Sequence, residues 1–182
     1  MRMEEEKLQI GGKELVLRNA EESEAGLLID YLKTVTAETR FLMCESDEVL
    51  LTVEDEEDFI RTHNESEDSL LIVAFLEGKY IGNCSFDRVG SSCRSHHRAG
   101  IGIALFQEYT GFGYGRIMLE RLLHEMKKAG YEQAELTVVG GNERACRLYK
   151  KLGFTECGRI PDANKYDDNT YADDIKMVRK LG

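Results

Sequence analysis

Three glycines separated by single residues, Gly111, Gly113 and Gly115, have the spacing that most directly indicates chemistry. An apolar run at residues 101–106 precedes them, and apolar residues with helical spacing follow over residues 114–129. Glycines at the start of a helix let the backbone approach a ligand closely and leave the first N–H groups free. The helix dipole adds partial positive charge at this end, so the arrangement predicts a binding site for a phosphate or pyrophosphate.

The glycine spacing disfavours two common phosphate-binding loops. A Walker A loop requires Gly-Lys-Ser/Thr, whereas Gly115 is followed by Arg116. A dinucleotide-binding loop has the spacing G-x-G-x-x-G, usually after the first strand, whereas this G-x-G-x-G run lies well past the middle of the chain. A nucleotide-binding module of the Rossmann type is therefore disfavoured.

Two segments together resemble a known family. Residues 110–115, Thr-Gly-Phe-Gly-Tyr-Gly, are similar to the pyrophosphate loop Gln/Arg-x-x-Gly-x-Gly/Ala of the GCN5-related N-acetyltransferase (GNAT) family, except that Thr110 replaces the Gln or Arg. Residues 142–154 fit that family's second motif, Asn-x-x-Ala-x-x-Leu-Tyr-x-x-x-Gly-Phe, throughout. A looser similarity near the C-terminus points to the branch of ribosomal-protein N-terminal acetyltransferases; it rests on Gly158, Arg159, Tyr171, Asp174 and Met177.

The resemblance implies transfer of an acetyl group from acetyl-CoA to a primary amine. It implies that the backbone near Leu105 and Phe106 holds the pantetheine arm and offers an N–H group to the thioester carbonyl, while both side chains remain free to pack in the core. The cofactor-binding residues implied in this way are Leu105, Phe106, Thr110, Gly111, Phe112, Gly113, Tyr114, Gly115, Arg116, Asn142 and Tyr149.

The resemblance also assigns a catalytic role to Tyr149, which would give a proton to the departing CoA thiolate; a packed aromatic residue with a satisfied hydroxyl is the alternative. Asn142 would contact CoA or cap its helix. Some relatives carry a basic Glu at the position of Thr137, and threonine cannot act as that base. Four substitutes are conceivable, each also readable as a surface residue, and none is assigned: Glu108, Glu135, His96 and His97.

Because Thr110 and Thr137 both depart from the family's pattern, a second hypothesis stays open. The chain would then be a catalytically silent, CoA-binding regulatory protein on the same fold, and Tyr149 favours the enzyme instead. The acceptor is not specified by the sequence. It is expected to be a small-molecule amine or the N-terminus of a peptide or protein, and dimers are common among relatives.

These residues must be positioned by a fold of alternating strands and helices. The resemblance implies a single GNAT domain over residues 1–182, in which a mixed, mostly antiparallel sheet of six to seven strands is flanked by about four helices. The patterns predict strands at residues 15–18, 70–76, 80–87, 98–107, 134–139, 155–160 and 171–178, and helices at 21–39, 53–63, 114–129 and 142–152.

The composition and charge of the chain limit the classes of partner that it is expected to bind. A length of 182 residues fits one domain, and the net charge of −10 disfavours nucleic acid and anionic membranes. The acidic residues 54–58 either attract a cationic acceptor or form a solvated helix face. Neither a membrane-spanning stretch nor a signal peptide is recognisable, so a cytoplasmic location is expected. The five cysteines include no C-x-x-C pair and no metal-ligand pattern, so free thiols and no metal are expected.

Overall fold

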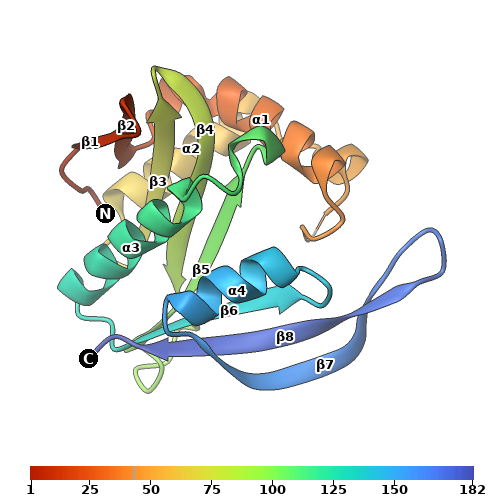
Figure 1. Ribbon diagram of the computed structural model, residues 1–182. Helices are drawn as coiled ribbons and strands as arrows, with labels where there is room; N and C mark the ends of the chain where they lie inside the picture. The colour runs from red at the N-terminus through yellow and green to blue at the C-terminus, as the bar shows by residue number, and fades with distance from the viewer. Residues whose placement is uncertain (43) are drawn as a thin grey trace.

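The computed structural model describes residues 1–42 and 44–182. One sheet of eight strands, in the order β1-β2-β3-β4-β5-β6-β8-β7, has helices on both faces (Figure 1). The strands are β1 (Glu6–Ile10), β2 (Lys13–Asn19), β3 (Ser69–Leu76), β4 (Lys79–Arg88), β5 (Arg98–Leu105), β6 (Gln133–Val139), β7 (Thr155–Lys165) and β8 (Tyr171–Lys180). The helices are α1 (Ala25–Glu38), α2 (Val53–Glu65), α3 (Tyr114–Lys128) and α4 (Glu143–Lys151).

The expected mixed, mostly antiparallel sheet is confirmed, since among the described strands only β5 and β6 pair in parallel. The sheet has one strand more than the upper expected number because β1 pairs with β2 across a turn of two glycines, Gly11 and Gly12. Both glycines have positive φ, +59° and +82°, which suits a two-residue hairpin. Strand β1 was not predicted from the sequence because it is a short, half-buried edge strand rich in charged residues.

Local sequence signals set the ends of several elements. Residues Glu77 and Gly78 join β3 to β4 with φ of +50° and +75°, as a tight hairpin requires. Helix α2 begins at a capping box, in which Thr52 accepts a hydrogen bond from the Asp55 N–H at 3.1 Å. After α4, Gly153 has a φ of +83°, which confirms it as the residue that ends this helix.

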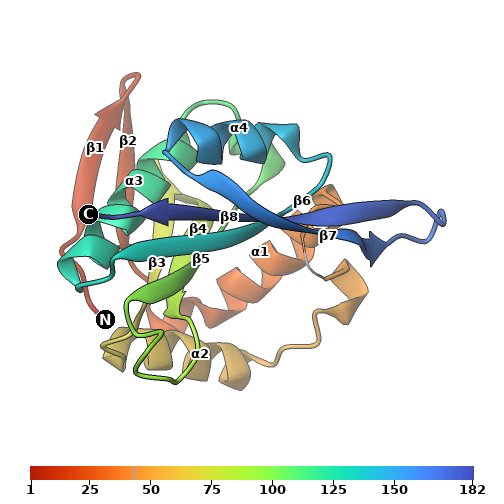
Figure 2. The same ribbon diagram turned by 90° about the horizontal axis from the view of Figure 1, so that it is seen from below.

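The sheet buries an apolar core on each face. The larger core lies between the sheet and helices α3 and α4, and the smaller core lies under α1 and α2 (Figure 2). Helix α3 contributes Met118, Leu119, Leu122 and Met126, which lie on one face of the helix and are fully buried. Burying each such side chain contributes about 1.5–3 kcal/mol, so α3 is firmly held and its N-terminus has a fixed place above the sheet.

The sheet opens between β5 and β6. These strands pair over only three residue pairs, which end at Gly100 opposite Glu135. Beyond that point β5 stays paired with β4, and β6 stays paired with β8, so the two strands diverge and a wedge forms between them. At the closed end, the Arg98 Nη2 donates to the Glu135 carboxylate at 2.8 Å. The wedge leaves one edge of β5 without a strand partner, so its backbone groups are available to a ligand.

Candidate functional site

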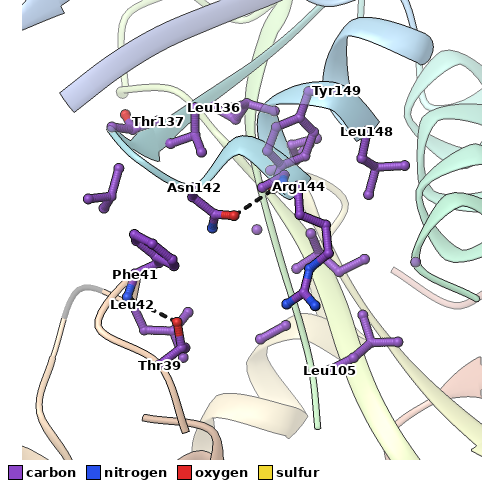
Figure 3. Close-up of a pocket in the computed structure, with 18 of the residues that line it drawn as sticks. Thr39, Phe41, Leu42, Leu105, Leu136, Thr137, Asn142, Arg144, Leu148 and Tyr149 are labelled. Carbon is purple, nitrogen blue, oxygen red and sulfur yellow. Dashed lines mark hydrogen bonds between the residues drawn. The ribbon is translucent and has the colours of Figure 1, made fainter. Parts of the chain in front are cut away.

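The wedge forms the floor of a large open cavity of about 1860 Å³. Its lining comes from β5, β6 and β8, from the start of α3, from α4 and from the segment after α1, so the cavity spans both faces of the sheet. Figure 3 shows side chains from these elements around the opening, with Leu105 and Tyr149 on one side and Thr39, Phe41 and Leu42 on another.

The glycine loop lies at the start of α3, as the sequence predicted. Gly111 and Gly113 have φ of +89° and +91°, and Gly113 is the N-cap residue of α3. Among the described residues no side chain caps this helix, and the Arg116 N–H donates to the Gly113 carbonyl at 3.1 Å, so the Tyr114 and Gly115 N–H groups are left for a ligand. A Cβ on Gly115 would lie 3.5 Å from Leu105 Cδ1, which shows that the helix start packs closely against the end of β5.

The two aromatic residues of the loop have different surroundings. The Phe112 side chain is 68% exposed, whereas Tyr114 is buried in the larger core. The Arg116 Nε donates to Glu120 at 2.8 Å along the exposed face of α3. Of the loop residues expected to touch a cofactor, Phe112 and Tyr114 do not line the cavity, whereas Thr110, the three glycines and Arg116 do.

Thr110 departs from the family's loop motif, and its hydroxyl group makes two hydrogen bonds. Its hydroxyl donates to the Gln107 carbonyl at 2.7 Å and accepts from the Arg144 Nη1 at 2.6 Å. Arg144 belongs to the first turn of α4 and reaches across the opening towards the strand that carries Leu105 (Figure 3). Sequence reasoning missed this arginine because it occupies a position that the second motif leaves free.

The structure gives Leu105 and Phe106 different places. The Phe106 N–H donates to the Ile81 carbonyl at 3.1 Å, and its ring packs edge-on against Tyr31, with the ring centroids 5.0 Å apart. Phe106 thus belongs to the smaller core and does not line the cavity. Because successive N–H groups of an extended chain point to opposite edges, the Leu105 N–H faces the wedge. Of the two, Leu105 is placed to meet a ligand through its backbone.

Tyr149 and Asn142 lie on the α4 side of the wedge. Burial raises the pKa of Tyr149 to about 12, so its hydroxyl keeps its proton at neutral pH. The ring packs against Phe154, with the ring centroids 5.9 Å apart, and the residue lines the cavity. Asn142 caps α4, since its Oδ1 accepts from the Ala145 N–H at 3.1 Å. The capping role expected for Asn142 is therefore confirmed.

On the opposite face of the wedge, small residues of β5 line the cavity, and the Lys176 side chain brings a positive charge. Gly100 and Gly102 of β5 line it, and a Cβ on either would approach no atom closer than 3.9 Å. Thr137 lies directly opposite Lys176 in the β6–β8 pairing, and the Lys176 Nζ donates to the Thr137 Oγ1 at 2.8 Å. Asp174 lies 3.8 Å from the same ammonium group. Some relatives have a basic carboxylate at this position, whereas here the Thr137 hydroxyl and the Lys176 ammonium lie there.

The substitute bases considered from the sequence are not free in this cavity. Glu135 lines it, but the Arg98 guanidinium bonds to its carboxylate and lowers its pKa. Glu108, His96 and His97 do not line it. Asp87, which the sequence reading passed over, does line the cavity and lies 3.2 Å from the Nε2 of the buried His63.

Beside this face of the cavity, contacts join segments that are distant in the sequence. The Arg40 guanidinium stacks 3.6 Å above the Tyr166 ring, and its Nη2 donates to the Thr170 hydroxyl at 2.7 Å. The Tyr166 hydroxyl donates in return to the Arg40 carbonyl at 3.1 Å. These contacts join the segment between α1 and α2 to the β7–β8 hairpin. Sequence reasoning gave no signal for them.

The acidic residues 54–58 lie on α2 and do not line the cavity. The Asp55 carboxylate accepts from the Thr52 N–H in the capping box, Asp58 pairs with Arg61, and burial raises the pKa of Glu56. Of the two readings of this stretch, the geometry supports the solvated helix face with a capping role. No described helix is long and apolar enough to cross a bilayer. Within residues 1–42 and 44–182, no group of three or more His, Cys, Asp or Glu side chains could hold a metal ion.

Comparison with known proteins agrees with this architecture. A model of the acetyltransferase (GNAT) family matches residues 32–154. The [ribosomal protein bS18]-alanine N-acetyltransferase of Escherichia coli K12 is 41% identical over 54 residues, which cover 30% of this chain and 36% of that relative. The aligned segment thus spans little more than a third of the curated relative's length.

Two solved structures are similar over nearly the whole chain. A GNAT-family acetyltransferase from Streptococcus pneumoniae has a TM-score of 0.86 and 28% identity, with 91% of this chain and 99% of that chain covered. A putative acetyltransferase from Salmonella typhimurium, solved with its cofactor acetyl-CoA, has a TM-score of 0.81 and 17% identity, with 92% and 94% covered. At that identity, the second similarity concerns the fold alone.

Proposed function

This chain belongs to the acetyltransferase (GNAT) family, and we propose that it transfers the acetyl group of acetyl-CoA to a primary α-amine. The observation that carries the proposal is the wedge, because it connects the glycine loop at the start of α3 to an open groove on the other face of the sheet. A donor that enters from the loop and an acceptor that enters from the groove would meet at the end of β5.

The donor is held by backbone groups in this proposal. The free N–H groups at Gly113 and the start of α3 bind the pyrophosphate, and the unpaired edge of β5 bonds to the amides of the pantetheine arm. The Leu105 N–H then lies at the thioester carbonyl, where negative charge develops during attack. One such preorganised donor is typically worth about 2.7–4 kcal/mol of transition-state stabilisation.

The chemical step is direct transfer. The amine nitrogen bonds to the thioester carbon, the C–S bond breaks, and the CoA sulfur leaves with the electron pair. A thiol with a pKa near 8.5 is a stronger acid than Tyr149 with a pKa of about 12, so complete proton transfer from Tyr149 would be uphill by about 5 kcal/mol. Tyr149 therefore stabilises the thiolate as a hydrogen-bond donor, and the amine's own proton, released through water, balances the charge.

The acceptor follows from the groove. Because Thr137, which accepts a hydrogen bond from the Lys176 ammonium, stands at the position of a basic carboxylate, the amine must arrive with an appreciable neutral fraction of its own. At pH 7.5 an α-amine with a pKa near 7.8 is neutral on the order of 10²-fold more often than a lysine amine with a pKa near 10.4. We therefore favour the N-terminus of a peptide or protein over a lysine side chain or a polyamine. The name of the Escherichia coli relative also specifies an alanine acceptor for that protein.

The first experiment is thermal unfolding with acetyl-CoA, using NAD and ATP as controls. A ligand at about 100 times its Kd adds about 2.7 kcal/mol, which raises the Tm of a domain of this size by roughly 5–11 °C. The second experiment measures thiol release with free amino acids, N-terminally free peptides and N-terminally blocked lysine peptides. Acetyl-CoA stabilisation without thiol release from any acceptor would favour the silent CoA-binding protein. A lack of stabilisation by acetyl-CoA would refute the donor site.

A further inference from the structure

The mouth of the wedge on the α4 side carries three arginines, of which one has no carboxylate partner. Arg116 pairs with Glu120 at 2.8 Å, and Arg147 pairs with Glu143 at 2.9 Å. Among the described residues, Arg144 forms no ion pair, and its Nη1 instead donates to the Thr110 hydroxyl. Its positive charge is thus uncompensated directly beside the glycine loop.

Thr110 is also the loop position at which the family motif has Gln or Arg. We propose that Arg144 supplies from α4 the cation that Thr110 cannot supply from the loop, and that its guanidinium binds the pyrophosphate of acetyl-CoA. The proposal rests on the donor site proposed above. It assigns a specificity-determining contact to a residue outside the glycine loop.

The geometry suits this role. Thr110 directly precedes Gly111, so a guanidinium on the Thr110 hydroxyl lies next to the loop's backbone N–H groups. The backbone of Arg144 is fixed, because it lies in the first turn of α4, which Asn142 caps. The contact to Thr110 uses one N–H of the five that a guanidinium carries, so the others remain for a planar, bidentate contact with phosphate oxygens.

The hydroxyl of Thr110 acts as a positioning group in this arrangement. It donates to the Gln107 carbonyl, so its lone pairs face the incoming guanidinium, and an exposed arginine is thereby held in one place. A pre-positioned side chain loses less conformational freedom when a ligand binds. Thr110 and Arg144, from two different elements, therefore together provide the pyrophosphate contact that the Gln or Arg of the loop would provide in the family motif.

The test compares three acetyl donors that carry different phosphates, the last of which also lacks the adenosine. They are acetyl-CoA, acetyl-3′-dephospho-CoA, which keeps the pyrophosphate, and S-acetylpantetheine, which lacks all phosphates. Arg144→Gln should raise KM about tenfold for both pyrophosphate donors, as expected for loss of a charge-assisted hydrogen bond, and leave kcat unchanged. KM for S-acetylpantetheine should stay within twofold of the wild-type value. Arg147→Gln, which removes a neighbouring arginine already paired with Glu143, is the matched control and should change none of these values by more than about twofold.

A rescue variant separates a binding role from a structural one. In Thr110→Arg combined with Arg144→Gln, the cation returns to the loop position that the family motif uses, so KM for acetyl-CoA should recover most of the loss. Equal weakening for all three donors would overturn the proposal, as would an effect confined to acetyl-CoA, which would assign Arg144 to the 3′-phosphate. An equal effect of Arg147→Gln would also overturn it. If the wild-type protein neither binds acetyl-CoA nor uses it, the proposed function itself fails, and this result is visible before any variant is made.

Discussion

Gly82 determines how closely β4 approaches the end of β5, so replacing it with alanine should damage activity more than stability. Gly82 pairs with Leu105 and has a φ of +152°. A Cβ at this position would overlap the Ala104 carbonyl oxygen and lie 2.8 Å from Leu105 Cα. Because ordinary carbon–carbon contacts are about 3.5 Å or longer, the backbone of β5 must move by roughly 0.7 Å or more.

That displacement falls on the residue whose N–H is proposed to polarise the thioester. A misplacement of about 1 Å in a catalytic geometry can cost on the order of 10²-fold in rate. We expect Gly82→Ala to lower kcat/KM for thiol release by roughly 30–100-fold. The backbone strain and overpacking should also reduce the free energy of unfolding by about 1–3 kcal/mol, or about 2–12 °C in Tm.

Gly78→Ala is the matched control. Gly78 has a φ of +75° in the β3–β4 hairpin, and no atom of the described residues lies within 4 Å of a Cβ built there. This variant should lose about 1 kcal/mol of stability through backbone strain and keep its activity. Both variants are compared by urea denaturation and by thiol release below 25 °C, where each is folded. A Gly82→Ala protein that is folded and retains kcat/KM within threefold of wild type would refute the positioning argument.

Three further outcomes are expected. Tyr149→Phe should lower kcat by about 10–100-fold while the Kd for acetyl-CoA, measured by calorimetry, stays within threefold; an unchanged kcat would leave the residue a packing role only. Because Tyr149 keeps its proton below a pKa of about 12, kcat/KM for a peptide α-amine with a pKa near 7.8 should rise with pH and level off above about pH 9 with no fall up to pH 10, and a descending limb near pH 9 would contradict this. Glu135→Gln should cost about 0.2–1 kcal/mol of unfolding free energy at pH 7. Since Arg98 depresses the pKa of Glu135, that contribution is present above its unfolded pKa and is lost as pH falls through the folded pKa; an equal cost at low pH, in urea denaturation at several pH values, would argue against the ion pair.

The elements that carry strong local signals could be predicted from the sequence. The glycine loop, the helix start at Tyr114 and the Asn142 cap follow from residue types at fixed spacings, and the structure has all three where expected. Strand β5 was predicted two residues too long, to residue 107, because a continuous apolar run does not show where strand pairing stops. For the same reason the sequence did not show that the Phe106 N–H pairs with β4 and that only the Leu105 N–H faces the wedge.

The contacts that complete the candidate site depend on long-range pairing. Lys176 meets Thr137 only because β8 lies beside β6 in one particular register, and a slip of β8 by one residue would turn the Lys176 side chain to the other face. Arg144 meets Thr110 across 34 residues of chain, since α4 packs beside the start of α3. Neither contact has a local pattern, so a sequence without homologues for comparison could not have indicated them.

Because β5 and β6 pair over so short a length, the sheet also divides into two groups of strands, here called panels, with a narrow connection between them. One panel contains β1 to β5, the other contains β6, β8 and β7, and three residue pairs connect them. A donor bound along the free edge of β5 would fill the space where β5 and β6 are not hydrogen-bonded to each other. Donor binding would therefore also connect the two panels. Backbone amides on both panels, including those of β8 that never touch the donor, should then gain protection from hydrogen exchange together when acetyl-CoA binds.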